Sequence, residues 1–301
     1  MLGKKDLETL DGYKLFEYQD LSVHLIPPQV FKLIEERVGA IREATYSQHL
    51  ASSGKIIDLD QRDMSYDHLI MISRTDTTLA GAARMQMIPG KRENFLENEL
   101  PGSGESYLEH VYPGIKRALY QQANHIEIGR VVITDSFQKR PHSLMCLFRG
   151  ALLIAKNSGY DHLFGLVSYN HFKYNNVTNS KFFNELMQDR FWVSDCMLPP
   201  ARYPAEFTEE ISNMEKCLSI KELETTISTK YDRGFKIPVL LKHYISLMEA
   251  RVAGLSIARD FNQITEILVT SNLRRVPKSR INYFVDIKHD PVYRKFKWFR
   301  G

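Results

Sequence analysis

Apolar residues recur along this chain at two spacings, and the clearest case is the stretch over residues 125–170. Residues 126–133 are rich in β-branched side chains, which is typical of a strand. From Pro141 the apolar positions follow the period of a helix, and Gly159 marks its end. A second short apolar run then covers residues 162–168. This order predicts a strand, a helix and a parallel strand, with a ligand site where the first strand meets the helix.

The rest of the chain carries the same two patterns. Prolines 27 and 28 begin a predicted helix that continues to about residue 50, after an extended lead-in over 13–26. Two antiparallel strands are expected across the turn RTDTT. The full set of further elements is strands at 68–73, 79–88 and 266–270 and helices at 114–123, 180–188, 220–230 and 238–253. A cluster of prolines near residue 200 divides the chain into a predicted core, 1–198, and a C-terminal extension, 199–301, that packs on it.

Composition is that of an ordinary globular protein, with 43% hydrophobic and 25% charged residues among 301. No apolar run is long enough for a signal peptide or a membrane helix, so the expected location is the cytoplasm. Three scattered cysteines are too few for a disulfide framework or a zinc site.

Charge is concentrated at the C-terminal end. From Arg274 onward nine Lys or Arg stand against two Asp, interleaved with aromatic residues. Such a tail could meet an anionic membrane surface, placing the protein at the periphery of the inner membrane, or it could meet an acidic partner protein. A solvated face anchored by aromatic side chains is the alternative, and no nucleic-acid partner is expected.

An acidic loop carries Asp58, Asp60 and Asp63 within six residues. It lacks the glycine and the terminal glutamate of a calcium loop, so no metal is expected, and the carboxylates should be solvated or pair with Arg or Lys. Arg84 lies inside a predicted strand. It either faces out of the sheet or pairs with an acid such as Glu127 or one of the loop aspartates.

Several segments in a fixed order carry a family resemblance: IREATY, IDLDQRDMSYDHLI, LAGAARMQ, IEIGRVVI, FRGALL, YDHLFGLVSYN, KIPVLLKHYISLMEARV and DFNQITEIL. This order resembles the N-acyltransferases that make ornithine lipids, glycine lipids and long-chain N-acyl amino acids. These enzymes belong to the Gcn5-related acyltransferase superfamily and are similar in core to acyl-homoserine lactone synthases. The resemblance implies an α/β fold of the acyl-CoA N-acyltransferase type, a twisted mixed sheet flanked by helices whose two central parallel strands splay apart.

The implied reaction passes a long acyl group from an acyl carrier protein or coenzyme A thioester to the amine of a small amino acid. No permanently bound cofactor is implied beyond the pantetheine arm of the donor. A base must deprotonate the ammonium before it attacks, and Glu127 matches the acid of the family's ExGR or ExSR pattern. Backbone N–H groups of Val131 and Val132 are the expected oxyanion donors.

The remaining site residues follow from the same matches. Arg130 and Arg84 match arginines that hold the acceptor carboxylate or brace the site. Arg42 and Glu43, together with the three loop aspartates, match the charged segment that covers the active site in this family. Ser168 is placed with the substrate-binding residues, because it lacks the strand-to-helix elbow of a serine nucleophile.

The expected phosphate-binding stretch departs from the superfamily pattern. Small-acyl members cradle the coenzyme A pyrophosphate with a glycine-bearing loop, whereas SFQKRPHSL contains no glycine. Lys139, Arg140 and His142 can bind a phosphate through side chains instead, which favours the single phosphate on an acidic carrier protein. Two rivals stay open: an autoinducer-type synthase that lactonises its acceptor, and a non-catalytic module that binds lipid or carrier protein.

Overall fold

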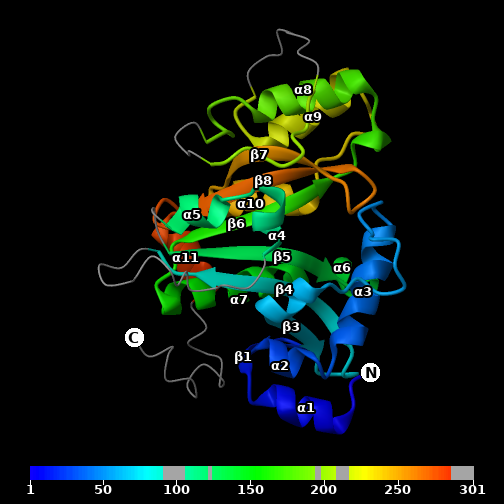
Figure 1. Cartoon of the computed structure of the whole chain (residues 1–301), viewed down its shortest axis with the longest axis vertical. Coiled ribbons are helices and arrows are strands. Elements are labelled where there is room, and N and C mark those ends of the chain that lie inside the picture. Colours follow the sequence, from blue (N-terminus) through cyan, green and yellow to red (C-terminus); the bar gives the residue numbers. More distant parts are fainter. Residues whose placement is uncertain (91–105, 121–123, 194–197, 208–216, 286–301) are drawn as a thin grey trace.

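The computed structural model describes residues 1–90, 106–120, 124–193, 198–207 and 217–285. Its centre is an eight-stranded sheet in the order β1-β2-β3-β4-β5-β6-β8-β7 (Figure 1). The strands are β1 Lys14–Tyr18, β2 Leu21–Ile26, β3 Asp67–Ser73, β4 Leu79–Ile88, β5 His125–Ile133, β6 His162–Tyr169, β7 Arg251–Ala258 and β8 Ile264–Asn272. All neighbours are antiparallel except β5 and β6, so the sheet is mixed, as predicted.

Helices cover both faces of this sheet. They are α1 Lys4–Asp11, α2 Pro28–Phe31, α3 Glu35–Ser47, α4 Tyr107–Val111, α5 Ile115–Tyr120, α6 Asp135–Gln138, α7 Pro141–Ser158, α8 Asn176–Leu186, α9 Ile220–Lys230, α10 Val239–Met248 and α11 Lys278–Val285, with 3-10 turns at Gln61–Ser65 and His171–Lys173. Helix α7 packs against β2 to β5 and against α11, while α3 packs on β4 and β5 from the other face. Helices α8 and α9 lie beyond β7, at the end of the molecule opposite α1 (Figure 1).

The predicted strand–helix–strand unit is confirmed, and its two strands separate. Pairing between β5 and β6 ends at Ile128 and Gly165, although β5 continues to Ile133 and β6 to Tyr169. Beyond that point β6 keeps its partner β8 to the end of the strand, and β5 keeps β4. The sheet therefore opens into two halves, β1–β5 and β6–β8, with a gap between them. The predicted splayed α/β fold is confirmed.

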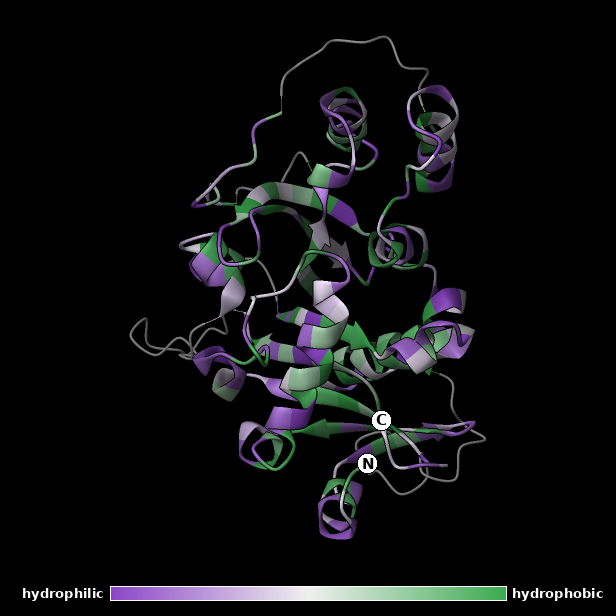
Figure 2. Ribbon diagram, turned by 90° about the vertical axis from the view of Figure 1, so that its right-hand side faces the viewer, coloured by the Kyte–Doolittle hydropathy of each residue, from purple (hydrophilic) through white to green (hydrophobic). Residues whose placement is uncertain are grey.

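Helix α7 fixes the geometry of this unit. It begins at Pro141, and its C-cap Gly159 takes the left-handed conformation (φ 73°) that glycine adopts without steric cost. Along its length apolar side chains such as Leu147 and Leu152 are buried against the sheet. Figure 2 shows the central strands as largely apolar, as expected for a sheet covered on both faces.

Some predicted elements were wrong in extent. The single helix expected from Pro28 is broken into α2 and α3, because Ile34 leaves the helical conformation (φ −130°) while its side chain stays buried. The helix predicted to residue 253 ends at Met248, where Glu249 turns left-handed. The chain then forms β7. Helix α1 and the β1–β2 hairpin were not predicted as such.

The extension after residue 198 contributes β7 and β8 to the same sheet. A domain boundary at that residue stays a prediction. Within the described ranges, no helix combines the length and the apolar character needed to cross a bilayer. Most of the predicted basic tail, residues 286–301, lies outside the described residues, and its membrane role stays a prediction as well.

Candidate active site

The gap between β5 and β6 holds a cavity of about 720 Å³. Its walls come from the diverging ends of both strands, from α4, from the C-terminal end of α3 and from the segment that leads into α10. A cavity at the carboxyl ends of parallel strands is where this topology was predicted to bind a ligand. A cavity of this size accommodates a cofactor-sized or drug-sized ligand.

Glu127 lies in the wall of this cavity with only 4% of its surface exposed. Its Oε1 atom accepts a hydrogen bond from the Tyr66 hydroxyl at 2.5 Å and another from the Leu108 N–H at 3.0 Å. The second oxygen, Oε2, has no hydrogen-bond partner among the described residues. Glu127 therefore faces the cleft, as the base assignment requires, and it also anchors the first turn of α4.

A second buried carboxyl, Glu266 of β8, lines the same cavity and was not predicted. Its side chain is 4% exposed and accepts a hydrogen bond from the Tyr107 hydroxyl at 2.9 Å. Burial raises the pKa of Glu266 to about 7, against the lowering effects of the Tyr107 hydrogen bond and the Arg130 charge. The family pattern singled out Glu127, and Glu266 matches no such pattern. The signal that could have marked Glu266 is an acid among the apolar residues of β8.

The two carboxyls and Ser168 share one face of the sheet. Ser168 is exposed, lines the cavity and lies opposite Glu266 in the β6–β8 register. Helix α4 spans the gap on this face, because Leu108 is bonded to Glu127 on one side and Tyr107 to Glu266 on the other. The opening between the strands is thus bridged by a short helix that two buried acids hold in place.

The predicted acidic loop pairs with arginines. The Asp63 carboxylate forms ion pairs with Arg42 and Arg84, whose Nη1 atoms lie 2.9 Å and 3.2 Å from Oδ1. All three side chains are at most 2% exposed. Burial of Asp63 is more than offset by these two cations, so its pKa lies well below the usual range. Arg84 also reaches Asp60, so the predicted pairing of Arg84 with a loop aspartate is confirmed.

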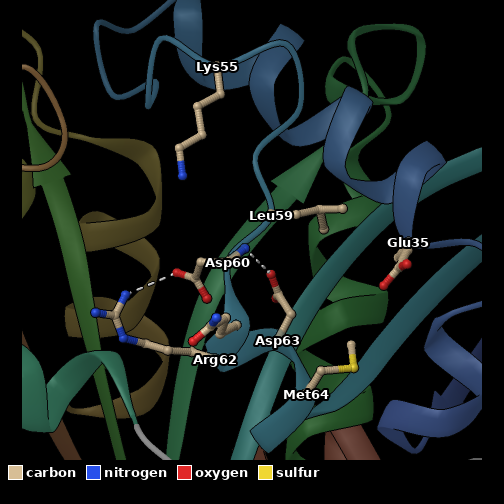
Figure 3. A pocket seen from close by; sticks show the side chains of 8 residues that line it. Glu35, Lys55, Leu59, Asp60, Arg62, Asp63 and Met64 are labelled. Carbon is tan, nitrogen blue, oxygen red and sulfur yellow. Dashed lines mark hydrogen bonds and ion pairs between the residues drawn. The ribbon is translucent and has the colours of Figure 1, made fainter.

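Asp60 has a second cation at its outer side. Figure 3 shows it turned toward the Arg62 guanidinium, with Asp63 bonded to the Asp60 backbone N–H and the Lys55 ammonium reaching toward the same hollow. Across the described residues, no group of three His, Cys, Asp or Glu side chains is arranged to hold a metal ion. These carboxylates stabilise buried arginines.

Arg130 occupies an unusual backbone position in β5. Its φ is 51°, and the β4–β5 register slips at this place, which is the geometry of a β-bulge. Its Nε pairs with Asp58 at 3.1 Å and its guanidinium lies 4.2 Å from the centre of the Phe261 ring. The bulge therefore turns a cation into the cavity wall at the point where β5 leaves β6.

The bulge also sets the direction of the neighbouring backbone groups. Thr134 N–H donates to Ala80 in β4, and Val132 is paired with Ala82. Because antiparallel hydrogen bonds recur at every second residue, Val132 directs its backbone toward β4. Val131 points to the opposite edge, where its carbonyl accepts a hydrogen bond from the Tyr46 hydroxyl at 3.4 Å.

Of the predicted phosphate ligands, two face away from the cavity wall. Arg140 forms an ion pair with Asp20 in the β1–β2 turn, and His142 Nε2 lies 3.7 Å from the same carboxylate. Lys139 is exposed. At this end the cavity is lined instead by Gln138, Leu144 and Ser143, whose buried hydroxyl has no partner in the described part of the chain.

Glu43 stands outside the cavity wall, where its carboxylate accepts hydrogen bonds from the Ser53 N–H and hydroxyl. The opposite wall is apolar. It combines side chains from α7, β6, α10 and the segment before α10: Leu144, Val167, Ile237, Val239, Leu240 and Tyr244. Glu127, Glu266 and Arg130 therefore lie on one side of the cavity and these apolar side chains on the other.

Comparison with known proteins bears on this site. Residues 41–148, which include β5 and the first part of α7, match the family model of the acetyltransferase (GNAT) domain. No protein of curated function matches the sequence. This match covers about a third of the chain and agrees with the predicted resemblance to the Gcn5-related acyltransferases.

Solved structures with a similar arrangement share little sequence with this chain. The CoA-dependent acyl-homoserine lactone synthase MesI is 11% identical, with a TM-score of 0.41 over 88% of this chain and 95% of that one. The loading GNATL domain of CurA from Lyngbya majuscula is 12% identical, with a TM-score of 0.45 over 86% and 99%. FeeM, an N-acyl amino acid synthase from uncultured soil microbes, is 10% identical, with a TM-score of 0.39 over 85% and 92%.

Similarity this low carries no weight for substrates, so the assignment depends on the family match together with the opened sheet and its cavity. Residues 41–148 are therefore similar to the acetyltransferase (GNAT) domain, and they belong to a sheet whose separated central strands enclose a cavity.

Proposed function

We propose that this protein transfers a long acyl group from the thioester of a phosphopantetheine arm to the amine of an amino-acid-like acceptor. The observation that carries the proposal is the cavity between β5 and β6, which is apolar on one side and lined by Arg130, Glu127 and Glu266 on the other. An acyl chain suits the first side and a zwitterionic amino acid suits the second.

The donor arm would lie along the free edge of β5. Beyond Ile128 this edge has lost β6, so an extended amide-bearing chain can pair with it much as an added strand does. Val131 points its backbone to this edge, and its N–H is the better candidate for the oxyanion of the tetrahedral intermediate. Val132, turned toward β4, is the weaker one.

The acceptor would be bound through both of its charges. Arg130 is held by Asp58 through Nε, so its terminal nitrogens are the groups that would receive the acceptor carboxylate in a two-point contact. The acids on the same wall would receive the ammonium. Arg84, enclosed by Asp60 and Asp63, is assigned to bracing the loop that covers the site.

The donor phosphate would lie at the start of α7. Arg140 and Lys139 are close in sequence to Ser143 and Leu144 of the cavity wall, and the Arg140 ion pair with Asp20 is 40% exposed on the arginine side. A pair this exposed contributes little stability and can exchange its partner. Lys173 and Lys236 are exposed and line the cavity, and these cations favour an acidic carrier protein as the donor.

The test is to incubate the purified protein with long-chain acyl carrier protein or acyl-CoA and each of a panel of amino acids, and to search for N-acyl products by mass spectrometry. The proposal expects an N-acyl amino acid, formed faster from the carrier-protein donor. A lactone product would identify an autoinducer-type synthase. Retained carrier binding with no product from any acceptor would contradict the proposal and favour a binding module.

A further inference from the structure

Two buried carboxyls face the proposed acceptor, and their surroundings differ. Glu127 Oε1 is occupied by two donors, the Tyr66 hydroxyl and the Leu108 N–H. Glu266 accepts one well-formed hydrogen bond, from Tyr107, and in both carboxyls Oε2 has no hydrogen-bond partner among the described residues. Both lie on the face that α4 covers. The chain therefore offers two candidates for one proton transfer.

We infer that Glu266 accepts the proton of the acceptor ammonium, and that Glu127 positions α4 and Tyr66. The inference rests on the proposed amine acylation and assigns the base to a different strand, β8 in place of β5. Position supports it, because Glu266 lies opposite Ser168, which is exposed in the cavity. An ammonium entering beside Ser168 would meet the free Oε2 of Glu266.

Nearby cations distinguish the two acids further. The Glu127 carboxylate interacts electrostatically with two cations, Arg84 and Lys116. The Arg84 guanidinium lies 4.5 Å from the centre of the Tyr66 ring. An incoming ammonium would be repelled by these two cations. The cation that acts on Glu266 is Arg130, which already has Asp58 as a partner.

The protonation equilibrium agrees with the geometry. The pKa of Glu266 is raised to about 7, chiefly by burial, and lies where a base can both ionise and hold a proton at neutral pH. The groups that face it are Tyr107 from α4, Arg130 from β5, Ser256 from β7 and Asp260 from the β7–β8 turn. Tyr107, Arg130 and Ser256 lower this pKa, while Asp260 raises it.

The chemical step balances without any further reactant. Ionised Glu266 takes one proton from the ammonium, and the neutral amine attacks the thioester carbonyl, forming a C–N bond. As the C–S bond breaks, the second proton of the attacking nitrogen goes to the leaving thiolate, which departs as a thiol. Glu266 then releases its proton to solvent. The products are one amide, one thiol and one proton.

The test compares the pH dependence of kcat/KM for N-acyl product formation in wild type, Glu266→Gln and Glu127→Gln. Wild type should gain activity through a midpoint near pH 7, where Glu266 ionises. Glu266→Gln should lose this rising limb and about 10²- to 10⁴-fold of the rate at neutral pH. Glu127→Gln should be slower but keep the limb.

Tyr107→Phe supplies a second readout. Removing the hydroxyl that lowers the pKa of Glu266 should move the midpoint of the rising limb to higher pH, which a merely structural loss would not do. A rising limb that survives in Glu266→Gln, or that disappears in Glu127→Gln, would overturn the assignment. Absence of any N-acyl product from wild type would overturn the proposed function along with it, so the two failures are distinguishable.

Discussion

Arg42 has no exposed surface, although it lies on a helix whose first turn faces solvent. Its Nη1 reaches Asp63 at 2.9 Å, and Arg84 approaches the same carboxylate oxygen. Two cations on one buried acid lower the pKa of Asp63, so their stabilisation is present above the ordinary carboxyl pKa of 3.8 and is lost as the pH falls. This cluster holds the acidic loop against the strand that carries Arg84.

Arg42→Met should therefore destabilise the protein strongly. Removing one member of a buried ion pair typically costs about 3–5 kcal/mol, because the remaining charge loses its partner. Urea unfolding at neutral pH measures the change. Arg37→Met on the same helix is the matched control, since Arg37 pairs with Asp6 at the surface and such pairs contribute at most about 1 kcal/mol. Equal losses in both variants would contradict a buried bracing role.

Glu266 should make the stability depend on pH in the opposite sense. Its pKa is about 7 in the folded protein against an ordinary 4.5, so the unfolded chain releases the proton first as the pH rises. The free energy of unfolding should fall between these values by about 3 kcal/mol. Glu266→Gln should remove this dependence and be the more stable protein above about pH 7. A stability difference that does not change with pH would refute this.

Individual residues were predictable where chemistry limited their options. A buried strand arginine needs an acid, and the sequence offered Arg84 three aspartates in one loop, which limited the choice of partner. Glu266 was missed because its strand was predicted to begin at that residue, which made it a terminal position. The predicted phosphate ligands Arg140 and His142 depend on Asp20, and no local pattern indicates that contact.

At the level of elements, the separation of β5 from β6 begins at a glycine. A Cβ atom added to Gly165 would lie 2.9 Å from the carbonyl oxygen of Ile128, and these two residues form the last pair before the strands diverge. Because the obstacle is backbone, it cannot move aside as a side chain can. A side chain at this position would therefore force the two strands apart where their pairing ends.

Gly165→Ala should destabilise the protein by about 1–3 kcal/mol, as overpacking does, and should impair donor binding. Thermal unfolding and titration with a stable acyl-pantetheine analogue measure both effects. For Gly129→Ala, on the neighbouring strand, the nearest atoms would be 3.7 Å away in the Arg84 side chain, so its stability should change little. A Gly165→Ala protein with normal stability and affinity would count against this account of the opening.

The apolar wall should set the length of the acyl chain. Leu240, in the first turn of α10, lines the cavity from the C-terminal extension. Leu240→Trp should fill that side and shift the preference of kcat/KM from palmitoyl toward short-chain donors. Leu33→Trp, at a residue 48% exposed, should leave the profile unchanged. An unaltered chain-length profile in Leu240→Trp would place the acyl chain elsewhere.

Elements with a strong period were predicted well, and elements defined by tertiary contacts were not. The spacing of α7, its proline start and its glycine end were all visible in the sequence. In contrast, β7 follows α10 after two residues, and its apolar positions continue those of the helix closely enough to hide the change of period. Helix α4 has five residues, too few for a periodic signal.

At the scale of the whole molecule, the site is assembled from distant parts of the chain. The family match covers residues 41–148 and supplies Glu127 and Arg130, while Glu266 and Leu240 come from beyond residue 199. Completion of the sheet by β7 and β8 brings these parts together. The splayed fold was predictable from the family resemblance. The contribution of the extension to the cavity was not, because it depends on how β8 pairs with β6 in the folded sheet.

The most direct test of the central claim is a crystal structure with an acyl-pantetheine analogue in which a methylene group replaces the thioester sulfur, so that a stable ketone keeps the acyl carbonyl. The quantity to measure is the distance from the analogue's acyl carbonyl oxygen to the Val131 nitrogen. A carbonyl within about 3 Å of that nitrogen, with the arm along the free edge of β5 and the acyl chain against Leu240, is the expected result. An analogue bound outside the gap between β5 and β6 would contradict the account.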